Sequence, residues 1–137
     1  MARWLAILVL MLPTVCLPAH AVTERIVFHL HESDPTLLQR ALTNLENLME
    51  KKQGQSLDVR LLLQGQSIRI LGWENYDTSI HRRLHMLLDE GVRIEVSRDN
   101  YLEHAGLLDE WVKPALVDNI FSRIIELQKQ GYTYLTP

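Results

Sequence analysis

The sequence predicts an α/β protein, a three-layer sandwich around a mainly parallel sheet of about five strands. Segments with strand-like patterns alternate with segments of helical periodicity along the chain. Parallel strands need a crossover connection, which is usually a helix, so this alternation favours parallel pairing. The second strand-like segment, Leu57–Leu63, ends in consecutive leucines, as in strands that are covered on both faces.

Composition is that of a single globular domain. The chain has 137 residues, of which 47% are hydrophobic and 23% charged. These values exclude a wholly disordered chain, a collagen-like chain and a membrane protein with several spans. The formal net charge is -3, so the composition does not show the excess of basic residues that is typical of proteins that bind nucleic acid.

The N-terminus has the layout of a secretory signal peptide. Arg3 precedes an unbroken apolar run, Trp4–Leu12, and an A-x-A site follows at 19–21. The run is shorter than the roughly 20 residues that cross a bilayer. We expect cleavage after Ala21, which leaves a domain at 22–137 in the periplasm or outside the cell and not in the membrane. The alternatives are an uncleaved anchor and lipidation at Cys16, which Val15 disfavours.

Cleavage would remove Cys16, the only cysteine in the sequence. The mature chain would then have no thiol, so it could form no disulfide and offer no cysteine nucleophile or metal ligand.

The first two elements of the mature chain have clear boundaries. Glu24–His31 alternates and predicts a strand, with Ile26, Phe28 and Leu30 on one face. Asp34 suits an N-cap, and Pro35 suits the first helical position. Apolar residues at 3.6-residue spacing then predict a helix from Pro35 to Lys52, closed by Gly54.

Strands and helices continue to alternate to the end of the chain. The expected strands are Leu57–Leu63, Val92–Val96, Ala115–Val117 and Tyr132–Leu135. The expected helical segments are a short turn at Ser67–Leu71, a helix at Thr78–Glu90, a short helix at Arg98–His104, and a last helix that Asp118 or Asn119 caps and Gly131 ends. Between the third and fourth strands, 106–114 is expected to be irregular.

Ligands of parallel sheets collect beyond the carboxyl ends of the strands. We therefore expect any functional site near four segments, which are His31–Asp34, Gln64–Ser67, Ser97–Asn100 and Asp118–Asn119.

Two histidine pairs are candidate metal ligands. His29 and His31 lie two residues apart on one strand face, and His104, Glu32 or Asp34 could complete a zinc or copper site. Alternatively, His29 packs in the sheet and His31 is an ordinary loop residue. His81 and His85 share a helix face but lack the glutamate of an H-E-x-x-H motif, so a solvated or interface face is the favoured interpretation.

Two strand ends resemble known site types only weakly. Gln64–Ser67 could aim backbone N–H groups at an anion, but it lacks the GK[ST] part of a P-loop, and a tight turn is the favoured interpretation. Ser97 lacks a surrounding G-x-S-x-G motif, which disfavours a serine nucleophile. Aromatic residues in loops or short turns, such as Trp73 and Trp111, could line an interface between subunits, or they could cover the edges of the sheet.

Several local motifs, in this order and spacing, resemble the DsrE/DsrF-like proteins, specifically their small single-domain, secreted branch. The resemblance runs from Arg25 to Pro137 and includes the turn at 31–35, the A-L-x-N-x-x-N-L helix at 41–48, the 64–68 turn and G-V-R-I at 91–94. The most distinctive piece is the tail Q-x-x-G-Y-x-Y-L-x-P at 128–137.

The resemblance implies a Rossmann-like fold, a homotrimer or hexamer and, in active members, sulfur relay through a persulfide on a cysteine after the third strand. The matching position here is Ser97, and a hydroxyl cannot carry a persulfide.

We therefore expect a non-catalytic protein without a cofactor that binds a small ligand or partner. The expected cleft residues are His31, Asp34, Asn44, Gln64, Gly65 and Ser97. One alternative is an accessory component of sulfur metabolism that acts with a partner protein's cysteine, and another is a metal-binding protein that uses His29 and His31.

Overall fold

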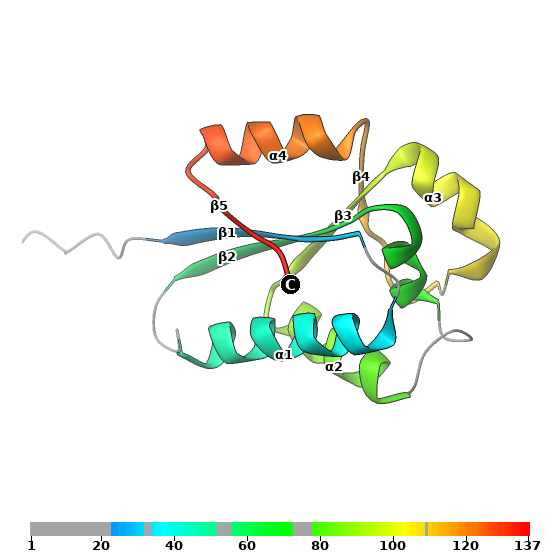
Figure 1. Ribbon diagram of the computed structural model, residues 1–137, viewed down its shortest axis with the longest axis horizontal. Helices are drawn as coiled ribbons and strands as arrows, with labels where there is room; N and C mark the ends of the chain where they lie inside the picture. Colours follow the sequence, from blue (N-terminus) through cyan, green and yellow to red (C-terminus); the bar gives the residue numbers. More distant parts are fainter. Residues whose placement is uncertain (1–22, 32–33, 52–55, 73–77, 109) are drawn as a thin grey trace, which may run out of the picture.

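A five-stranded parallel sheet forms the middle layer of the protein (Figure 1). The computed structural model describes residues 23–31, 34–51, 56–72, 78–108 and 110–137. The strands are β1 (Glu24–Leu30), β2 (Leu57–Leu63), β3 (Arg93–Ser97), β4 (Ala115–Val117) and β5 (Thr133–Leu135). Their order is β4-β3-β2-β1-β5, and each neighbouring pair is parallel. The predicted α/β class is therefore confirmed.

Helices cover both faces of the sheet. The helical elements are α1 (Pro35–Lys51), the 3₁₀ helix η1 (Gly65–Leu71), α2 (Thr78–Asp89), α3 (Arg98–His104), the 3₁₀ helix η3 (Ala105–Leu107) and α4 (Ile120–Lys129). Figure 1 shows α1 and α2 on one side of the sheet and α4 on the other. The described residues contain no helix that is long and apolar enough to cross a membrane.

Helix starts follow the capping signals in the sequence. The Asp34 carboxylate accepts hydrogen bonds from the backbone N–H groups of Thr36 at 2.7 Å and Leu37 at 3.4 Å. Asn119 caps α4 by accepting from the Ser122 N–H at 3.0 Å. Both side chains satisfy N–H groups that a helix leaves without an internal partner, so these two helices begin where polar caps precede apolar stripes.

Alternate residues of the central strands face two separate cores. Ile26, Phe28 and Leu30 of β1 pack in the larger core with α1 and α2. Val27 of β1 packs in the smaller core with Ile120 and Leu127 of α4. His29 has the same parity as Val27, so it points to the α4 side of the sheet.

A buried carboxylate holds α4 against the sheet. Glu95 on β3 is 1% exposed and accepts a hydrogen bond from Arg60 of β2 at 2.8 Å. It also accepts two from Arg123 of α4, at 2.6 Å and 3.1 Å. The bidentate hydrogen bond to Glu95, helped by the more exposed Glu126, holds the pKa of Arg123 well above its ordinary value although burial acts in the opposite direction, so the guanidinium stays charged.

The predicted boundaries differ from the structure by small amounts. The first strand ends at Leu30 and not at His31, and the helical turn expected from Ser67 begins at Gly65. The segment expected to be irregular after Gly106 begins inside a short 3₁₀ helix. Such shifts are typical because the ends of helices and strands depend on neighbouring contacts. The predicted signal peptide, Glu32, Trp73 and the helix end at 52–54 lie outside the described residues.

Candidate functional site

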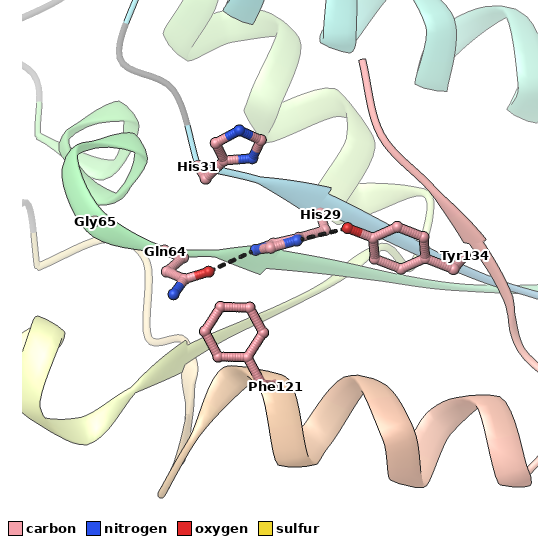
Figure 2. A pocket seen from close by; sticks show the side chains of 6 residues that line it. All are labelled: His29, His31, Gln64, Gly65, Phe121 and Tyr134. Carbon is pink, nitrogen blue, oxygen red and sulfur yellow. Dashed lines mark hydrogen bonds between the residues drawn. The ribbon is translucent and has the colours of Figure 1, made fainter.

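A pocket of about 470 Å³ opens at the carboxyl ends of β1 and β2, on the side that α4 covers. Its volume lies within the range of roughly 300–1,000 Å³ that is typical of small-molecule sites. Figure 2 shows its lining, which consists of His29, His31, Gln64, Gly65, Phe121 and Tyr134. The pocket therefore lies at the sheet edge where the sequence predicted a site.

His29 is the centre of this pocket. Its side chain is buried, at 4% exposure, and both ring nitrogens have partners. Nδ1 lies 2.9 Å from the Tyr134 hydroxyl, and Nε2 lies 3.0 Å from Gln64 Oε1. The Gln64 carbonyl oxygen can only accept, so Nε2 carries the hydrogen and Nδ1 accepts from the Tyr134 hydroxyl.

Burial makes His29 a neutral group. Desolvation lowers the pKa of His29 below its ordinary value of 6.5, the hydrogen bond to Gln64 raises it in part, and the nearby His31 lowers it further. At neutral pH the Tyr134–His29–Gln64 chain therefore carries no net charge. It forms a continuous hydrogen-bonded chain along one wall of the pocket.

Aromatic rings form most of the remaining wall. The His29 ring centroid lies 5.6 Å from that of His31 and 5.9 Å from that of Tyr134. In Figure 2 the Phe121 ring approaches His29 from α4, while His31 lies on the other side of it. Phe121 is 59% exposed, which is unusual for a phenylalanine.

The structure brings together four of the residues singled out from the sequence, His29, His31, Gln64 and Gly65. Gly65 has φ 58, a left-handed conformation that glycine adopts without strain, and this conformation turns the chain sharply after β2.

Three expected cleft residues do not line this pocket. Asp34 is used as the cap of α1, and Asn44 is exposed on α1, across the sheet from α4. Ser97 caps α3, and its hydroxyl accepts from the Asn100 N–H at 3.3 Å. Asn100 in turn donates to the Gly65 carbonyl at 3.1 Å, so the Ser97 turn supports the pocket wall from behind.

The His29–His31 pair does not have the arrangement of a preformed metal site. Both nitrogens of His29 are hydrogen-bonded, so a metal would have to displace Gln64 or Tyr134. His104, one suggested third ligand, places Nδ1 2.9 Å from the Asn100 carbonyl. Among the described residues, no group of three or more His, Cys, Asp or Glu side chains could hold a metal ion.

The second histidine pair packs on Trp111. The His85 ring stacks on the indole with centroids 3.7 Å apart, and His81 meets it edge-on at 5.4 Å. Trp111 is half-buried under these rings, so it is not the freely exposed aromatic that the sequence suggested for an interface. This pair fixes the segment before β4 on α2.

Sequence reasoning missed Phe121 and Tyr134 as pocket residues. The sequence did hold a signal for Phe121. The buried face of α4 is formed by Ile120 and Leu127, with Ile124 half-buried, and Phe121 does not belong to that face. Tyr134 had no such signal, because it reaches His29 only once β5 pairs with β1.

Comparison with known proteins finds likeness in structure but not in sequence. No family model matches the chain, and no curated protein matches it. The protein of unknown function MTH1491 from Methanobacterium thermoautotrophicum has a TM-score of 0.69 at 21% identity, over 83% of this chain and 99% of that one. The YchN protein of E. coli has a TM-score of 0.64 at 15% identity, with the same coverages. YchN has a DsrE-like fold, and this chain therefore has a DsrE-like fold as well.

Proposed function

We propose that this protein binds a small molecule in the His29 pocket and works outside the cytosol without sulfur-transfer chemistry of its own. The observation that carries the proposal is the buried His29, held between Tyr134 and Gln64 in the wall of an open pocket. Buried polar groups at the ligand edge of a parallel sheet, surrounded by rings, are typical of a binding site.

The absence of sulfur transfer rests on Ser97 and Cys16. Ser97 stands at the position where the resemblance implies a persulfide-carrying cysteine, and its hydroxyl is used to cap α3. Cys16 is the only cysteine in the sequence and lies in the segment expected to be cleaved. Mass spectrometry of the secreted protein after polysulfide treatment tests this. We expect a chain that starts at Val22 and no added sulfur, and a stable sulfur adduct would contradict the proposal.

Binding is tested by NMR of the histidine and methyl groups during a screen of small fragments. We expect bound fragments to shift the His29 ring resonances. The Ile125 methyl resonances serve as the control, because Ile125 lies one turn beyond Phe121 on α4, is 52% exposed and does not line the pocket. Fragments that shift only residues elsewhere would count against the site, and no binding at all would count against the function.

We further propose that the protein forms a homotrimer or hexamer, as the family resemblance implies. Leu102 of α3 and Leu107 of η3 leave apolar side chains exposed away from the pocket lining, at 65% and 45%. Such side chains are compatible with a subunit interface. Light scattering should give the mass of a trimer or larger, and a monomer mass at micromolar concentration would overturn this proposal.

A further inference from the structure

We infer that the ligand of the His29 pocket is a small uncharged molecule with a planar body and a carbonyl-type hydrogen-bond acceptor. This inference rests on the proposed function and goes beyond it by naming the chemical class that the pocket selects. Three features of the lining support it, namely the ring surfaces, the absence of charged side chains among the described lining residues, and the side-chain NH₂ of Gln64, which has no hydrogen-bond partner in the part of the chain that the structure describes.

Planarity follows from the rings that surround the pocket. His29, His31, Phe121 and Tyr134 each contribute a ring to the lining. Phe121 and Tyr134 are 59% and 37% exposed, so their faces are available for contact. Flat molecules gain offset-stacked or edge-on contacts with such rings that a rounded aliphatic molecule of the same volume does not gain.

The charge state of the lining selects against ions. None of the described residues that line the pocket is a carboxylate, lysine or arginine. His29 is neutral because its burial opposes protonation. An ion drawn into such a pocket loses hydration without gaining a buried partner. His31 is exposed at the mouth, where solvent screens any charge contact.

The acceptor follows from the direction of the hydrogen-bond chain. The side-chain oxygen of Gln64, Oε1, accepts the hydrogen bond from His29, and its amide nitrogen points away from His29 in Figure 2. An amide nitrogen carries two donor hydrogens and no acceptor. A ligand carbonyl oxygen can therefore accept from Gln64, while the Tyr134 oxygen, which donates to His29, keeps lone pairs for a ligand N–H.

Three probes of nearly identical shape test the class. Benzamide is neutral, benzoate is an anion and benzamidine is a cation, and all three place a planar head group on the same ring. Each is titrated at about pH 8, where an ordinary histidine is neutral, and the His29 ring resonances report binding. We expect benzamide to bind at least about tenfold more tightly than either ion. Cyclohexanecarboxamide, which keeps the head group but is not planar, should bind more weakly than benzamide.

Two variants on α4 test whether benzamide binds in the His29 pocket. Phe121→Ala should weaken benzamide binding about three- to tenfold, because it removes one ring face. Ile125→Ala should leave it unchanged, because Ile125 is similarly exposed on α4 but does not line the pocket. Equal loss in both variants would refute this placement of the ligand.

The outcomes separate this inference from the proposed function. Tighter binding of benzoate would show an anion site and overturn the inference while the binding function stands. Tighter binding of benzamidine would show a cation site and would overturn the inference in the same way. If none of the probes shifts the His29 resonances, the inference fails, and the fragment screen alone then decides whether the proposed binding function stands.

Discussion

Removal of the Glu95 carboxylate should destabilise the protein more than any exposed charge change. Glu95 is 1% exposed and accepts hydrogen bonds from Arg60 and Arg123 at 2.8, 2.6 and 3.1 Å. Breaking a buried ion pair by removing one partner typically costs about 3–5 kcal/mol, because the remaining charge is left uncompensated. The two arginine side chains are 17% and 23% exposed and can regain some water. We therefore expect Glu95→Ala to lower the free energy of unfolding by about 3 kcal/mol.

The replacement Glu95→Gln separates charge from shape. It keeps the volume of the side chain and one acceptor oxygen, but it turns an amide NH₂ group toward a guanidinium. Hydrogen bonds to charged groups contribute about 1.5–3 kcal/mol, so we expect a loss of roughly 2 kcal/mol. The matched control is Glu126→Gln, which removes a 60% exposed carboxylate 3.2 Å from the same Arg123 and should change stability by less than about 1 kcal/mol.

Urea denaturation measures all three variants. The midpoint should fall while the slope m stays constant, since the exposed surface of the unfolded chain is unchanged. A loss for Glu95→Ala no larger than that of Glu126→Gln would refute the reasoning. It would show that the arginines find other partners and that α4 does not depend on this carboxylate.

Three further predictions concern His29, His81 and Gly65. Burial lowers the pKa of His29 from 6.5, so just below that pH the unfolded chain binds more protons than the folded chain. The free energy of unfolding should therefore fall when the pH is lowered from about 8 to about 5.5. The variant His29→Gln should show a smaller fall over the same pH range. His81→Phe should leave the free energy of unfolding unchanged or raise it by up to about 1 kcal/mol. It keeps a ring against Trp111 and removes a buried Nε2 that has no hydrogen-bond partner in the described part of the chain. A clear loss of stability in urea denaturation would contradict this prediction. Gly65→Ala should lower the free energy of unfolding by about 1–2 kcal/mol, because Gly65 has a φ of 58 that strains any other residue. Gly106→Ala is the control and should leave stability unchanged, because Gly106 has no positive φ. Equal effects of the two variants would be evidence against conformational strain at Gly65.

Local signals along the chain were sufficient for most of the fold. Alternation in β1 identified the two faces of the strand, and Asp34 with Pro35 located the start of α1. The consecutive leucines of β2 indicated a strand covered on both sides, as the two cores confirm. These features were readable because each depends on residues close together in sequence.

The candidate site was predictable only in part. His29, His31, Gln64 and Gly65 lie at the ends of β1 and β2, and the rule for parallel sheets pointed to that edge. Asn44 was placed in the cleft by the family resemblance, whereas the structure places it on α1, across the sheet. Its helix position was clear from the sequence, but the layer to which the helix belongs was not.

The sequence by itself determined which segments are strands and helices to within a few residues, which face of β1 carries Ile26, Phe28 and Leu30, and that the only cysteine lies near the N-terminus. Only the tertiary structure decided that β5 returns beside β1 and that α4 covers the opposite face from α1. Those two choices bring Tyr134 and Phe121 to His29. The sequence could not show them, because strand order depends on contacts between residues about a hundred positions apart, such as His29 and Tyr134, for which short-range periodicity carries no information.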